Sequence, residues 1–103
     1  MRTIVQRYPG KDPAEIFERA RTALWDRRRE ISSHDLIDQI LRAVKWDPRT
    51  LRGGGTKRVM MVKSTVDLRV DGEELRLDLK VPLKKYEDKY ADRIQKVFET
   101  LFD

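Results

Sequence analysis

The chain of 103 residues has no cysteine and one histidine, His34. Without thiols there is no disulfide framework, thiolate metal site or cysteine nucleophile, and one histidine excludes the histidine clusters of most zinc sites. No apolar run approaches the roughly 18 residues of a membrane-spanning helix, and the first residues lack the apolar segment of a signal peptide. We therefore expect a cytoplasmic protein without membrane insertion, with no catalytic residues, no cofactor and no bound metal.

Charged residues are abundant, at 40% of the chain against 39% that are apolar. The apolar share is enough for one modest core, so we expect a single domain over residues 1–103. The chain has 23 basic and 18 acidic residues, a net charge of +5. Most of the excess lies in the first half. Such an excess is found in nucleic-acid-binding proteins and also in ordinary basic domains.

The first half predicts a short strand followed by two helices. Residues 3–8 are rich in β-branched and aromatic side chains, as strands are. Asp12 suits a helix N-cap, Pro13 suits the first helical position, and Glu15 completes a capping box. A second start at Ser32 leads into residues that end before Asp47-Pro48. The predicted core faces are Ile16, Phe17, Ala20, Ala23, Leu24 and Ile31, then Leu36, Ile37, Ile40, Leu41, Ala43 and Val44.

The second half predicts a hairpin and a closing helix. Apolar and polar residues alternate over 62–70 and 75–81, around an Asp71-Gly72 pair that suits a two-residue turn. This turn sets Leu68 opposite Leu75, Val66 opposite Leu77, Arg69 opposite Glu74 and Asp67 opposite Arg76. Residues 83–102 then present an apolar stripe at helical spacing, which predicts a core face. The stripe consists of Leu83, Tyr86, Tyr90, Ile94, Val97, Phe98 and Leu101.

Together these elements predict a two-layer α+β fold. We expect a three-stranded, mostly antiparallel sheet with three helices on one face, in the order β-α-α-β-β-α. The charged face of the hairpin must contact water, so the helices belong on its other face.

Two basic segments are the candidate binding residues. Residues 49–58 form a basic connector, which Gly53–Gly55 predict to be mobile over residues 52–57. Its glycines and lysine do not follow the order of a phosphate-binding P-loop. Trp25 and Trp46 either stack on bases or close the edge of the core, and we favour the core. The candidate contacts for nucleic acid or another anion are Arg27, Arg28, Arg29, Arg49, Arg52, Lys57 and Arg58.

Part of the chain resembles a known family. One strand carries Val66, Leu68 and Val70, a second ends in Val81-Pro82-Leu83, and a closing helix carries Tyr86, Ile94 and Leu101. In these features residues 62–102 resemble the small polyhydroxyalkanoic acid system proteins, encoded near polyhydroxyalkanoate synthesis genes. The resemblance implies an association with polyhydroxyalkanoate granules and implies no catalytic residues. The element order is also similar to a shortened helix-grip fold, with a long last helix against the sheet.

Two hypotheses about function follow. The first is a small non-catalytic binding or assembly module, which pairs its open sheet edges with a second copy or with a protein partner. The alternative is a nucleic-acid-binding protein without sequence preference, which uses the basic connector. An enzyme is not expected, because no nucleophile stands with a base in the sequence pattern.

Overall fold

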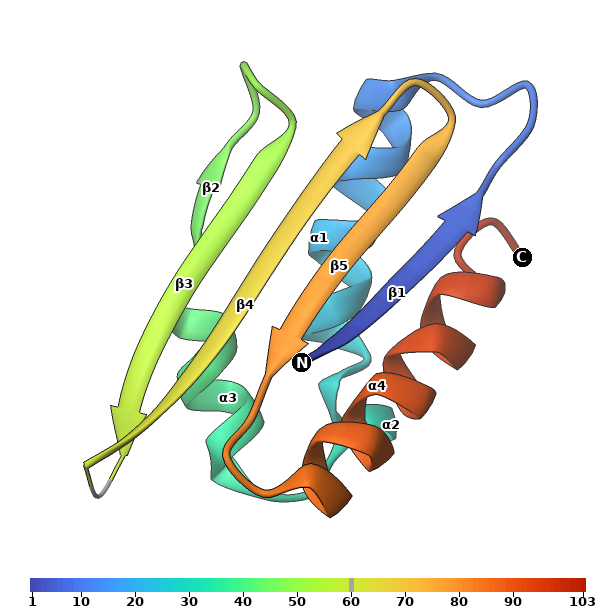
Figure 1. Ribbon diagram of the computed structural model, residues 1–103. Coiled ribbons are helices and arrows are strands. Elements are labelled where there is room, and N and C mark those ends of the chain that lie inside the picture. Colours follow the sequence, from blue (N-terminus) through green and yellow to red (C-terminus); the bar gives the residue numbers. More distant parts are fainter. Residues whose placement is uncertain (60) are drawn as a thin grey trace.

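The computed structural model describes residues 1–59 and 61–103. These residues form an antiparallel sheet in the order β1-β5-β4-β3-β2, and the helices all cover one of its faces (Figure 1). The α+β class is therefore confirmed, but the predicted three strands and three helices are wrong, since the described residues form five strands and four helices. The elements are β1 (Arg2–Arg7), α1 (Pro13–Asp26), α2 (Arg28–Ile31), α3 (Asp35–Arg42), β2 (Lys45–Asp47), β3 (Arg52–Val59), β4 (Val62–Asp71), β5 (Glu74–Lys80) and α4 (Lys84–Glu99).

Helix α1 begins where its capping residues predict. The Asp12 carboxylate accepts the Glu15 N–H at 3.3 Å, and Pro13 follows as the first helical residue. The helical layer then divides, because the chain leaves α1 at Arg27 and forms the short α2. The second predicted helix corresponds to α3, although its N-cap is His34 and not Ser32. The Ser32 hydroxyl instead accepts the His34 N–H at 3.1 Å.

Strand β3 replaces the predicted mobile connector. Gly53 pairs with Leu68 of β4 and Trp46 of β2, and Gly55 pairs with Val66. A Cβ added to Gly55 would lie 2.6 Å from the carbonyl oxygen of Ala43, too close for any side chain. Glycine is therefore the residue that lets the chain after α3 pack directly on the strand. Consecutive glycines predict flexibility, but here Gly53 leaves room for the Trp46 ring and Gly55 for the Ala43 backbone.

The β4–β5 register also differs from the prediction. Leu68 pairs with Leu77, a shift of two residues from the expected Leu75. The loop is Gly72-Glu73, and Gly72 has a φ of +60° at the first loop position, where a type II′ turn requires glycine. The Tyr8 N–H holds this loop from β1, by donating to the Glu73 carbonyl at 2.9 Å. A shift of two keeps the same side chains inside, so alternation could not distinguish the two registers.

The shift changes the charged pairs on the open face of the sheet. Arg69 lies opposite Arg76 and Asp67 opposite Asp78, where pairs of opposite charge were expected. Like charges directly across a sheet are unfavourable, and neighbours in adjacent rows compensate. Asp78 accepts the Thr3 hydroxyl at 2.6 Å and lies 3.7 Å from the Arg76 guanidinium.

Helix α4 supplies the predicted apolar face, with one exception. Ile94, Val97 and Phe98 are buried, while Leu83, expected in the core, precedes the helix and is 60% exposed. The Tyr8 hydroxyl donates to the Phe98 carbonyl at 2.6 Å, and burial raises the pKa of this tyrosine.

In the described part of the chain, no helix has the length and apolar character needed to span a bilayer.

Glu87 is a buried carboxylate in the first turn of α4. It accepts the Val81 N–H at 2.9 Å and lies 3.1 Å from the N-terminal ammonium. Burial by itself favours the protonated acid. The hydrogen bond and the ammonium outweigh burial and keep the pKa of Glu87 below its ordinary value.

Candidate functional site

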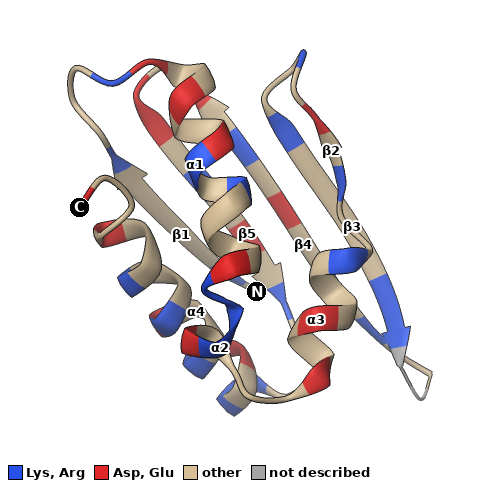
Figure 2. Ribbon diagram, turned by 180° about the vertical axis from the view of Figure 1, so that it is seen from behind, with Lys and Arg blue, Asp and Glu red and all other residues tan. Residues whose placement is uncertain are grey.

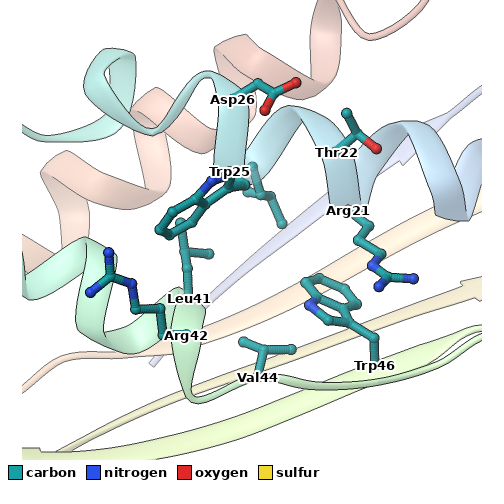
Figure 3. Close-up of a pocket in the computed structure, with 9 residues that line it drawn as sticks. Arg21, Thr22, Trp25, Asp26, Leu41, Arg42, Val44 and Trp46 are labelled. Atoms are coloured by element: carbon teal, nitrogen blue, oxygen red, sulfur yellow. The ribbon is translucent and has the colours of Figure 1, made fainter.

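A pocket of about 470 Å³ opens between α1, the end of α3 and β2. Its volume falls in the range typical of small-molecule sites. Figure 3 shows Trp25 and Trp46 on either side of the pocket, with Leu41 and Val44 between them. Leu24, Leu41 and Val44 are buried and form an apolar floor. The other residues that line it are Arg21, Thr22, Asp26 and Arg42.

The Trp46 ring is held in place by two neighbours. It occupies the space above Gly53, where an added Cβ would lie 2.6 Å from Cζ3 of the indole. It also meets the edge of Phe17 at 5.8 Å between ring centroids and 78° between planes, a favourable aromatic geometry. This fixed ring gives the pocket one rigid aromatic wall.

Trp25 forms the second aromatic side and is surrounded by guanidinium groups. Arg28 lies 4.0 Å from the ring centroid and Arg42 lies 5.4 Å from it, both within the range of cation–π attraction. Arg28 also donates to the Trp25 carbonyl at 2.8 Å, which ties the end of α1 to α2.

The mouth of the pocket carries more positive than negative charge. Arg21 lies 5.9 Å from the Trp46 centroid, and its ion pair with Glu18 is long, at 3.8 Å. Among the residues that the structure describes, no carboxylate forms a salt bridge with Arg42. Asp26 adds one carboxylate at the rim. The arrangement therefore offers flat rings beside guanidinium groups, which suits a planar ligand carrying an anionic group.

The arginines predicted at the end of the first helix hold the helical layer together. Arg27 pairs with Glu30 at 2.7 Å and donates to the Val97 carbonyl at 3.3 Å. Arg28 and Arg29 both pair with Asp38 of α3, Arg28 at 3.4 Å. These side chains join α2 to α3 and α4, so they have internal partners where an anion contact was predicted.

The predicted residues of the connector are spread along β3. Arg49 lies in the turn before this strand, where its N–H donates to Asp47 at 3.0 Å, and Arg58 lies near the other end. Arg52 and Arg58 are six positions apart along the strand, about 20 Å at roughly 3.3 Å per position. Lys57 lies on the helix-covered face, because it pairs with the buried Ser64. The structure does not bring the seven predicted residues together on one surface.

The sequence analysis missed Arg21 and Arg42 as partners of the two tryptophans. No local spacing connects residues 21–26 with residues 41–46. The tryptophans were the one available signal, and we had favoured a core role for them. In the described part of the chain, no three histidine or acidic side chains gather in a way that could hold a metal ion.

Comparisons with known proteins add no assignment to this site. No protein-family model matches the sequence, and neither the curated proteins nor the solved structures contain a match to it.

Proposed function

We propose that this protein is a non-catalytic binding module that holds a planar aromatic anion of the nucleotide type in the two-tryptophan pocket. One observation carries the proposal: three separate segments of the chain bring Trp25, Trp46, Arg21 and Arg42 around one cavity with an apolar floor.

The chemistry of the pocket supports this ligand class in two ways. Stacking of a base on an aromatic side chain contributes roughly 1–3 kcal/mol to the binding free energy, and all types of base can stack. Arginine binds phosphate through parallel N–H donors, and Arg42 has these donors uncommitted to a carboxylate within the described structure. Free nucleotides and the exposed bases of a single strand share this chemistry. We therefore propose this pocket, and not the basic connector, as the contact for nucleic acid.

Intrinsic fluorescence provides a direct test, because the sequence has two tryptophans and both line the pocket. We expect nucleoside monophosphates or a short single-stranded oligonucleotide to quench the emission in a saturable way. Inorganic phosphate at the same concentration should have a much smaller effect, since it cannot stack. Binding of the oligonucleotide alone would assign the site to single strands.

Arg42→Gln is the informative variant, and Arg49→Gln is its matched control. Both side chains are exposed, but Arg42 borders the pocket, whereas Arg49 lies outside it in the turn between β2 and β3. Loss of a charged hydrogen bond should weaken binding about tenfold or more in Arg42→Gln and leave Arg49→Gln unchanged. No fluorescence change at about 1 mM of any of these ligands, a free energy near −4 kcal/mol, would refute the proposal.

A second proposal, self-association, is supported by an open sheet edge. Strand β2 pairs only with residues 52–54 of β3, and in the described structure no other strand pairs with the same edge over residues 55–59. Such an edge offers backbone donors and acceptors to another strand. Light scattering after size exclusion tests this: a mass of one chain at all concentrations would exclude it. The association with polyhydroxyalkanoate granules that the resemblance of residues 62–102 implies also stays a proposal.

A further inference from the structure

A second surface lies at the end of the molecule where β4 and α4 both begin (Figure 1), and a groove joins the two starts. Three large apolar side chains are exposed there: Met61 at 89%, Leu83 at 60% and Val62 at 43%. Val62 and Leu83 border one groove of about 280 Å³. The rest of its lining is mostly apolar and consists of Leu36, Ser64, Val81, Pro82 and Tyr86.

Exposed cations lie near these apolar side chains. Lys84 and Lys85 follow Leu83, while Lys63 follows Val62 and, with its cross-strand partner Arg58, projects from the opposite face of the hairpin. Figure 2 shows this basic concentration at the tip of β3 and at the start of α4. We call Arg58, Met61, Val62, Lys63, Leu83, Lys84 and Lys85 together the hairpin–α4 surface.

The acidic groups closest in the chain leave this charge largely uncompensated. Glu87 is buried against the N-terminal ammonium, and Asp88 pairs with Arg2 at 2.8 Å. Asp35, next to Leu36 of the groove, is exposed and adds one negative charge. The surface therefore combines exposed apolar side chains with a net positive charge.

The start of α4 is also poorly suited to helix stability. Leu83 is the N-cap and provides no side-chain hydrogen bond, although serine or aspartate is preferred at this position. Lys84 and Lys85 follow, at the end of a helix where the dipole disfavours positive charge. Apart from the contact of Lys85 with the Tyr86 ring at 5.3 Å, these three side chains add little to the stability of α4, which points to a role in an interaction.

We propose that the hairpin–α4 surface docks on an anionic lipid bilayer, with Met61, Val62 and Leu83 in the interface and the cations on the headgroups. Both parts of the surface match this occupant, since apolar burial and attraction of lysine to anionic lipid act together. A second copy of the chain is a poorer match, because a twofold contact would bring the same cations face to face.

The test is co-sedimentation of the full chain with phosphatidylcholine vesicles, with and without phosphatidylglycerol. We expect binding to the anionic vesicles, weakening as salt is raised, and little binding to the neutral ones. Lys84→Gln with Lys85→Gln should lower the affinity roughly 25-fold, at about fivefold per cation. Arg49→Gln, at the opposite end of β3, is the charge control and should bind almost as well as the unmodified chain.

Leu83→Ser separates binding from folding. It removes an apolar contact with the bilayer, which should weaken binding about tenfold or more. It also supplies a side-chain cap to α4, so the melting temperature should stay unchanged or rise. Val5→Ser is the apolar control, because Val5 is 43% exposed on β1 and lies outside this surface.

Three results would overturn the proposal. The first is failure of the unmodified chain to sediment with anionic vesicles at low salt. The second is Leu83→Ser binding as strongly as Val5→Ser. The third is a dimer that dissociates in Leu83→Ser without any vesicle binding, which would assign the surface to a second copy.

Discussion

The β5 half and the β3 half of the sheet meet the helical layer, which covers one face, in opposite ways. On the β5 side, Leu75, Leu77 and Leu79 project into the core and meet the helical layer through large apolar side chains. On the β3 side, Gly53 and Gly55 have no side chain, so Trp46 and the chain after α3 lie directly on the strand backbone. Large apolar side chains can therefore fill the space between a sheet and a helical layer, or glycines can let the two layers approach directly. Only the first arrangement produces an alternating apolar pattern in the sequence.

The largest loss of stability should come from removing a large side chain from the core. Phe98 is fully buried on α4, and Phe98→Ala should cost about 3–5 kcal/mol through lost burial and the cavity left behind. The hydrogen bond from Tyr8 to the Phe98 carbonyl involves backbone and does not depend on the side chain. Thermal unfolding should show a melting temperature lower by about 10 °C or more. An unchanged value would mean that α4 does not close the core.

A smaller loss of stability should come from adding a side chain at a glycine of β3 that has no room for one. Gly55→Ala places a Cβ against the backbone of Ala43 and Val44, which cannot rotate away, and should cost about 1–3 kcal/mol. Gly54→Ala is the matched control, because its Cβ would meet nothing closer than 3.8 Å. That variant should be neutral or more stable by about 0.5 kcal/mol, since alanine orders at lower entropic cost. Equal stability of the two variants in denaturant titrations would refute the close approach at Gly55.

The smallest effect concerns the charge at Glu87. Its pKa is lowered in the folded protein, so the folded state favours the ionised form. The resulting stability is present above the ordinary glutamate pKa of about 4.3 and is lost as pH falls through the folded-state pKa. Glu87→Gln keeps an acceptor for the Val81 N–H and removes the charge, at a cost of about 0.5–1.5 kcal/mol near neutral pH. The difference in melting temperature from the unmodified chain should shrink in acid. A difference that is constant with pH would contradict this role.

Sequence signals predicted an element correctly where the residues of that element were enough to define it. Asp12 and Pro13 marked the start of α1, and the alternation of residues 62–81 identified two strands and the face that they bury. They failed where the evidence lay in a distant partner. The loop at Gly72-Glu73 is held from β1, and the role of Gly55 depends on α3. Strand β2 has three residues, too few to produce any periodic pattern.

The candidate site follows the same division. Trp25 and Trp46 were noticed as residues able to stack on bases, but their arginine partners lie on other elements and could not be assigned from spacing. The basic residues that stood out in the sequence, Arg27–Arg29, have internal carboxylate and carbonyl partners. Clustered charge in a sequence does not show whether the charges find partners within the fold.

By itself, the sequence determined the α+β class, the buried faces of α1, β4, β5 and α4, and the absence of thiol chemistry. These properties depend on periodicity and composition, which are local to each segment. The tertiary structure decided the number of strands, the hairpin register, the role of the glycines and the grouping of Trp25, Trp46, Arg21 and Arg42. Those properties depend on which distant segments meet, and a two-residue shift or an empty Cβ position leaves the local pattern unchanged.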